Sequence, residues 1–73
     1  MIAPMRQKFY ENYDVVKMTR SSVVVRHKRN GSEAFMHRNA FNQLDNAEGY
    51  RVVEKSFHGN TSYWVEVLVW QAL

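Results

Sequence analysis

The sequence predicts a small α+β fold, with an antiparallel sheet of about five strands and one helix packed on a face, in the order β-β-β-α-β-β. Two observations predict it. Runs rich in valine and aromatic residues, which favour extended backbone, recur along the chain between short turn segments. One stretch between the third and fourth of these runs has apolar residues at helical spacing instead. With 73 residues the chain has room for one compact domain, residues 1–73.

The N-terminal part of the chain is compatible with two structures. Met5, Phe9 and Tyr13 are spaced four apart and follow Pro4, a residue suited to the first turn of a helix. The segment is therefore either a short helical turn or a loose arm, which is common at termini. Two strands are predicted after it, at residues 13–19 and 23–28, separated by a turn at residues 20–22. Three consecutive valines in the second run strongly favour extended backbone.

A hairpin turn is predicted at Asn30-Gly31, because both residues tolerate positive φ. A two-residue type I′ turn there pairs Lys28 with Glu33, which are oppositely charged. The returning strand covers residues 32–37. The alternative for this stretch is a helix that is capped by Ser32 and runs to about residue 47. We favour the strand.

The helix is predicted at residues 39–46. Ala40, Phe41, Leu44 and Ala47 share one apolar face, while the intervening polar residues face water. Gly49 is expected to end this helix in the left-handed conformation that glycine adopts at low cost.

The last two strands are predicted at residues 50–55 and 63–70, around a turn at residues 56–62. Alternation places Trp64 and Trp70 on one face of the final strand and Tyr63, with three valines, on the other. Both faces are largely apolar. One face meets the helix, and the other requires the N-terminal segment, a second subunit or a partner protein to cover it.

Composition excludes several classes of protein. The chain has no cysteine, which rules out disulfides and thiolate metal sites and fits a reducing compartment. No apolar stretch approaches the roughly 20 residues of a membrane helix, and residues 1–4 lead into charged residues rather than a signal-peptide core. We therefore expect a cytoplasmic protein with no membrane partner. Small domains often rely on a second chain for stability, so a homodimer is compatible with the sequence.

No catalytic signature is present, and the sequence predicts neither an enzyme nor a cofactor. No serine lies in a nucleophile elbow, and the carboxylates are scattered. His27 and His37 are expected on adjacent strands, near Glu33, but their spacing matches no established metal-binding pattern. We predict no catalytic residue and no metal site.

The favoured function is that of a non-catalytic protein-binding module, which acts as an inhibitor or adaptor of a larger protein. Small single-domain chains of this type are common among accessory proteins of phages and mobile elements, and the expected targets include proteins that handle nucleic acid. The aromatic residues of the last strand are the expected anchors, and two arginines are expected to steer association. These protein-binding candidates are Tyr63, Trp64, Trp70, Arg26 and Arg29.

The alternative function is nucleic-acid binding by a basic β-hairpin. The net charge of +3 is a mild bias toward acidic partners. Consecutive basic residues precede the predicted turn, and such a ribbon fits the phosphate backbone. Cations at a hairpin tip also keep an exposed strand soluble, with no ligand involved. The nucleic-acid-binding candidates are Lys17, Arg20, Arg26, Lys28 and Arg29.

Overall fold

The structure is a computed structural model that describes residues 3–70. It confirms the α+β class, with a five-stranded sheet and two α-helices. The predicted order β-β-β-α-β-β is confirmed, and the undecided N-terminal segment is a helix. The elements are α1 (Pro4–Asn12), β1 (Tyr13–Met18), β2 (Ser22–His27), β3 (Glu33–His37), α2 (Arg38–Gln43), the 3-10 turn η1 (Leu44–Asn46), β4 (Ala47–Phe57) and β5 (Asn60–Val69).

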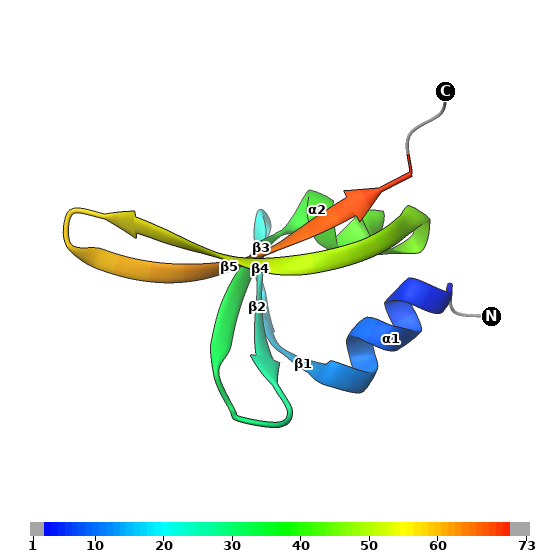
Figure 1. Ribbon diagram of the computed structural model, residues 1–73, viewed down its shortest axis with the longest axis horizontal. Coiled ribbons are helices and arrows are strands. Elements are labelled where there is room, and N and C mark those ends of the chain that lie inside the picture. The colour runs from blue at the N-terminus through cyan, green and yellow to red at the C-terminus, as the bar shows by residue number, and fades with distance from the viewer. Residues whose placement is uncertain (1–2, 71–73) are drawn as a thin grey trace.

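The strands lie in the order β1-β2-β3-β5-β4, and the long β4–β5 hairpin crosses the full width of the molecule (Figure 1). Neighbours are antiparallel except β3 and β5, which run parallel and pair through Phe35 and Trp64. The sheet is therefore mixed, whereas the sequence predicts an antiparallel one. The difference arises because α2 and η1 connect β3 to β4, which lies at the edge of the sheet and not next to β3. The β4–β5 hairpin then returns the chain, so that β5 lies between β4 and β3 and runs parallel to β3.

Helix α1 forms because Pro4 supplies the φ of a first helical turn, and it ends where Tyr13 takes extended backbone. Its Phe9 side chain is fully buried. The Phe9 ring stacks on Tyr13, with centroids 4.9 Å apart, and meets the edge of Tyr50 at 5.2 Å. Offset-stacked and edge-to-face arrangements are the favourable ones for aromatic rings. Packing on the sheet thus stabilises a helix too short to persist alone.

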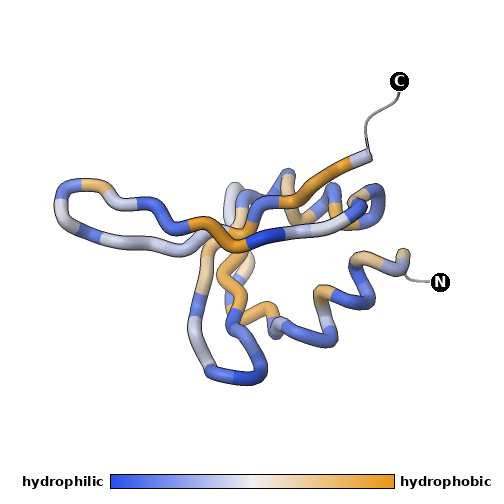
Figure 2. Tube along the Cα trace, viewed as in Figure 1, coloured by the Kyte–Doolittle hydropathy of each residue, from blue (hydrophilic) through white to orange (hydrophobic). Residues whose placement is uncertain are grey.

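Both helices pack on the same face of the sheet. The buried residues of the strands alternate along the chain, so they point to one face. Helix α1 adds one buried residue to this cluster, and α2 with η1 adds two, as the predicted apolar helix face requires. Figure 2 shows the hydrophobic segments gathering where the strands cross. The cluster comprises Phe9, Tyr13, Val23, Val25, Ala34, Met36, Phe41, Leu44 and Val65.

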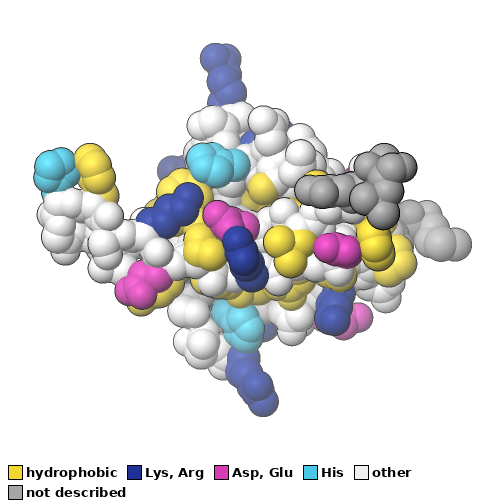
Figure 3. All heavy atoms as spheres, turned by 45° about the horizontal axis from the view of Figure 1, so that its top comes forward, with side chains coloured by type: hydrophobic (Ala, Val, Ile, Leu, Met, Phe, Trp, Pro, Cys, Tyr) yellow, Lys and Arg dark blue, Asp and Glu magenta, His cyan; other side chains and the backbone are white. Residues whose placement is uncertain are grey.

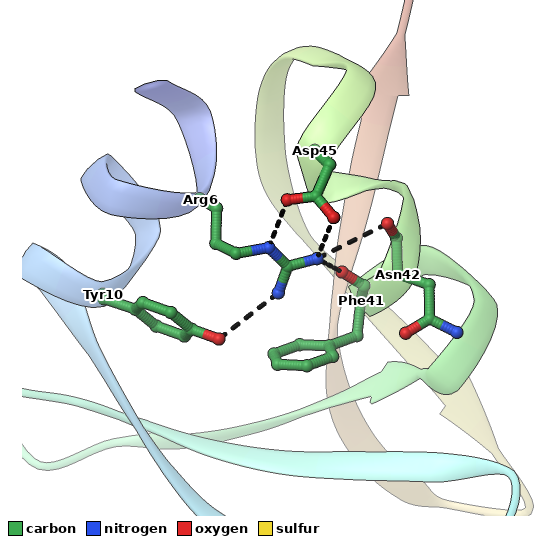
Figure 4. A network of polar contacts seen from close by, with 5 residues as sticks. All are labelled: Arg6, Tyr10, Phe41, Asn42 and Asp45. Atoms are coloured by element: carbon green, nitrogen blue, oxygen red, sulfur yellow. Dashed lines mark hydrogen bonds and ion pairs between the residues drawn. The ribbon is translucent and has the colours of Figure 1, made fainter. Parts of the chain in front are cut away.

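A polar network joins the two helices at the border of this core (Figure 4). The Arg6 guanidinium donates to the Asp45 carboxylate at 2.6 Å and to the Phe41 carbonyl oxygen at 2.7 Å. It also donates to the Tyr10 hydroxyl at 3.3 Å and lies 4.8 Å from the centre of the Phe41 ring. The hydrogen bond that Arg6 donates to Asp45 raises the pKa of Arg6 against the opposing effect of burial. One planar cation therefore ties α1 to the end of α2.

We expect Arg6→Lys to lower the free energy of unfolding by about 1–2 kcal/mol, because an ammonium group cannot reproduce the planar fork of donors. Asp45 is half-exposed, which holds the effect below that of a buried ion pair. Urea unfolding measures the change, with Arg29→Lys in the exposed β2–β3 loop as the matched control. Equal stability of the two variants would show that the network does not stabilise the fold.

Tyr13 gives the fold a pH dependence at the alkaline end. Burial raises the pKa of its phenol above the ordinary 10.0, and the neighbouring Tyr50 adds to the shift. The folded state therefore favours the neutral phenol. This contribution to stability is present below the unfolded pKa and is lost as the pH rises through the higher folded pKa. We expect the free energy of unfolding to fall more steeply above pH 10 in the wild type than in Tyr13→Phe. Urea unfolding across that range checks it, and identical slopes would contradict it.

The two hairpin turns differ from the prediction. Asn30-Gly31 does not form a type I′ turn, because within residues 3–70 only His58 among non-glycine residues has positive φ. Instead Asn30 accepts hydrogen bonds from the backbone N–H and the hydroxyl of Ser32, at 2.9 and 2.6 Å. These bonds lengthen the loop and shift the register by two residues, so Glu33 faces Arg26 rather than Lys28. The shift preserves which face each side chain takes.

The two-residue turn with positive φ at both positions lies instead at His58-Gly59, where φ is 51° and 78°. It closes a hairpin longer than predicted, because β4 and β5 extend into the segment expected to be a loop. The prediction for Gly49 is also wrong. Gly49 lies in β4, where the pairing with β5 shifts register after Ala47. The helical segment ends at Asn46, the predicted last residue, because Ala47 already takes extended backbone.

Candidate functional site

The candidate site is the sheet face opposite the helices, which we call the open face. A continuous row of paired residues crosses it from β1 to β4. Apart from the lysine at one end, the row is apolar, and no described residue of this face is fully buried. Phe35 remains 42% exposed. The row consists of Lys17, Val24, Phe35, Trp64 and Val53.

Trp64 is the centre of the open face and is held in place on several sides. The His37 ring stacks on it with centroids 4.8 Å apart, and Phe35 lies 5.5 Å away on the same neighbouring strand. The Lys55 ammonium lies 5.2 Å from the centre of the indole ring. The indole N–H donates to the Ser62 hydroxyl at 3.0 Å. A side chain fixed in this way loses little conformational freedom when a partner binds it.

A groove of about 360 Å³ runs beside Trp64. Its walls come from His37 at the end of β3, from Ala40 in α2, from Arg51 and Lys55 in β4, and from the part of β5 between Trp64 and Leu68. The groove adjoins the parallel pairing of β3 with β5, whose paired residues are Phe35 and Trp64. The open face thus offers an apolar ridge with an adjoining hollow.

Charges of both signs surround the row. Arg26 pairs with Glu33 at 2.6 Å, and Arg51 pairs with Glu66 at 3.1 Å. Figure 3 shows a face of the molecule on which hydrophobic side chains alternate with cations and carboxylates. An apolar centre within a mixed-charge border is the usual anatomy of a protein–protein interface.

The structure separates the predicted protein-binding residues. Trp64 and Arg26 lie on the open face, whereas Tyr63 points to the helix side and Arg29 lies in the β2–β3 loop. Trp70 follows the end of β5 and is 70% exposed. The predicted anchors therefore do not form one patch.

The predicted basic hairpin is largely neutralised. Arg26 and Lys28 have carboxylate partners, Glu33 at 2.6 Å and Asp14 at 3.7 Å. Lys17 lies on β1 at the edge of the open face, and Arg20 lies in the turn at the opposite end of β2 from Arg29. The five predicted nucleic-acid contacts thus do not form one continuous cationic surface.

Sequence reasoning missed several residues of the open face. Phe35, His37 and Lys55 surround Trp64, and Val53 completes the row. The alternation of side chains along a strand shows only which face of its own strand each of these residues occupies. Finding them together requires the strand order, in which β5 lies beside β3, and no local pattern encodes that order.

Other kinds of site find little support among the described residues. In residues 3–70 no three histidine, aspartate or glutamate side chains lie close enough together to hold a metal ion. Across the same residues, neither helix has the length and apolar character to cross a membrane.

Comparison with known proteins identifies no family: the chain matches no protein-family model, no curated protein and no solved structure.

Proposed function

We propose that the protein is a non-catalytic binding module that binds a larger protein through its open face and thereby acts as an inhibitor or adaptor of that protein. The observation that carries the proposal is the apolar row across the open face, centred on Trp64 and left uncovered by both helices. Contiguous apolar patches left open to water commonly mark interaction sites. Tryptophan is among the residues most enriched at the energetic centre of interfaces.

The charge pattern favours a protein partner over nucleic acid. A phosphate-binding surface needs cations whose charge is not already neutralised. On the open face the cations Lys17, Arg26, Arg51 and Lys55 are interspersed with the carboxylates of Asp14, Glu33 and Glu66. A border of alternating charge instead matches a partner surface with its own mixed charges and fixes the register of docking.

The action we infer is steric. A rigid sheet face that occupies a functional surface of the target blocks that surface without any chemical step. Trp64 supplies the central contact, the groove beside it receives an apolar side chain of the target, and the paired arginines Arg26 and Arg51 form the rim. We further propose that the module is a cytoplasmic accessory protein of the phage or mobile-element type, and that its targets include proteins that handle nucleic acid.

A second candidate is single-stranded nucleic-acid binding on the same face. Phe35 and Trp64 lie side by side on adjacent strands, and Lys55 lies over the indole ring. Aromatic residues on the central strands of an open sheet are a known platform for stacked bases. This observation, rather than the basic hairpin, supports the alternative.

Affinity capture from lysate, with and without nuclease, distinguishes the two candidates. The tagged wild type and Trp64→Ala are compared. Our proposal expects a protein that survives nuclease and is lost with Trp64→Ala. Recovery of nucleic acid, or of proteins lost on nuclease treatment, would replace it with the second candidate. Self-association of the wild type alone would identify a second copy of the chain as the occupant.

A further inference from the structure

A second hollow, separate from the groove beside Trp64, lies where the β1–β2 turn meets the start of α2. Figure 1 shows this turn beside α2. The hollow has a volume of about 560 Å³, within the range of small-molecule sites. We call it the arginine hollow, and its lining residues are Arg20, Ser21, His37, Arg38, Asn39 and Asn42.

The walls of the arginine hollow are held by a set of short hydrogen bonds. The backbone N–H of Arg38 donates to the Ser21 carbonyl oxygen at 2.9 Å, and the Arg38 guanidinium donates to the Thr19 carbonyl oxygen at 2.7 Å. The turn itself is closed by Thr19 and Ser22, which exchange backbone and hydroxyl hydrogen bonds between 2.8 and 3.1 Å. The two arginines are therefore presented from a preformed turn and helix start.

The lining is cationic and contains no carboxylate. Every salt bridge among the described residues involves other cations, so neither Arg20 nor Arg38 is neutralised there. Arg38 uses one N–H of its guanidinium on Thr19, and the group has five. Serine and asparagine residues add uncharged hydrogen-bonding groups to the lining. This contrasts with the open face, where each arginine has an acidic partner.

We propose that the arginine hollow binds a phosphate group as its dianion. Two guanidinium groups offer planar forks of donors that match phosphate oxygens, and the charge-assisted bonds they make are among the strongest in proteins. The site is distinct from the proposed partner surface, although His37 lines both the hollow and the groove. The phosphate is either a free ion or a phosphorylated side chain, and both share this chemistry.

The test is a titration of the full chain followed by amide NMR at constant ionic strength. The probes are inorganic phosphate and O-phosphoserine, and the controls are chloride and serine. We expect saturable shifts at Ser21, Arg38 and Asn39 with the phosphate probes only. Tighter binding of phosphoserine would identify a phosphorylated side chain as the source, and tighter binding of inorganic phosphate would identify the free ion.

Arg20→Gln is the informative variant, because within residues 3–70 the salt bridges all involve cations other than Arg20, and the hydrogen bonds that hold the hollow come from Arg38, Thr19 and Ser22. We expect it to weaken phosphate binding about tenfold, the effect of losing one charge-assisted hydrogen bond. Arg29→Gln removes the same charge at the opposite end of β2 and should leave binding unchanged. The absence of saturable shifts, equal shifts with chloride, or equal losses in both variants would overturn the proposal.

Discussion

Replacing Phe9 with alanine is expected to lower the free energy of unfolding by about 3–5 kcal/mol, the usual cost of truncating a fully buried phenylalanine. The ring is the main apolar contribution of α1, and it touches Tyr13 and Tyr50 from two different strands. A domain of this size is stabilised by about 4–11 kcal/mol in total. The variant should therefore be close to unfolding, and α1 should lose its place on the sheet.

Urea unfolding followed by circular dichroism measures the loss for Phe9→Ala. Phe9→Leu, which keeps most of the buried volume, remains measurable if the alanine variant does not fold, and we expect it to lose about 1–1.5 kcal/mol. The matched control is Phe57→Ala at the tip of the β4–β5 hairpin, where the ring is 75% exposed. Its stability should stay within about 0.5 kcal/mol of the wild type. A Phe9→Ala variant as stable as Phe57→Ala would mean that α1 does not pack as described.

The second large effect is expected at Trp64. Trp64→Ala should weaken binding of the captured protein partner by at least about 30-fold, since residues at the centre of an interface contribute 2 kcal/mol or more. The loss is expected because His37, Lys55 and Ser62 hold the indole ready for binding. Isothermal titration calorimetry with the purified partner gives the change in affinity.

Tyr63→Ala is the matched control for Trp64→Ala. The two residues are adjacent in β5, both are aromatic, and alternation places them on opposite faces. Tyr63 is 48% exposed on the helix side, so its loss should change affinity less than threefold. Comparable losses at both positions would mean that the partner contacts more than the open face. Circular dichroism of both variants verifies that each remains folded.

Much of the local structure follows directly from the sequence. The valine-rich runs form strands because branched side chains suit extended backbone. Phe41 and Leu44 are buried because helical spacing places them on one face. In β5 the predicted separation of Trp64 from Val65 is confirmed, since Val65 is buried in the core and Trp64 lies opposite. These features depend on a few neighbouring residues, which a sequence pattern captures.

Two kinds of feature do not follow from local sequence patterns: those in which a side-chain hydrogen bond competes with a backbone turn, and those that depend on contacts between residues far apart in the chain. Asn30 and Gly31 together suggest a type I′ turn, but the hydrogen bonds that Ser32 donates to the Asn30 side chain stabilise a longer loop. Gly49 is a residue type that commonly ends helices, yet it lies in β4, where the pairing with β5 shifts register. The open face depends on the parallel pairing of β3 with β5, which joins Phe35 to Trp64 across 29 positions of sequence.

The most direct test of the open face as the binding surface compares two variants of β4, each with one lysine on a different face of the strand. The measurement is nuclease-resistant capture of the partner. Val53 lies in the apolar row beside Trp64, and its neighbour Val52 points to the opposite face, where it is 45% exposed. If the open face binds the partner, Val53→Lys should abolish capture by burying an unpaired charge in the interface, and Val52→Lys should retain it. Capture that survives Val53→Lys, or that is lost equally with Val52→Lys, would contradict the assignment of the open face as the binding surface.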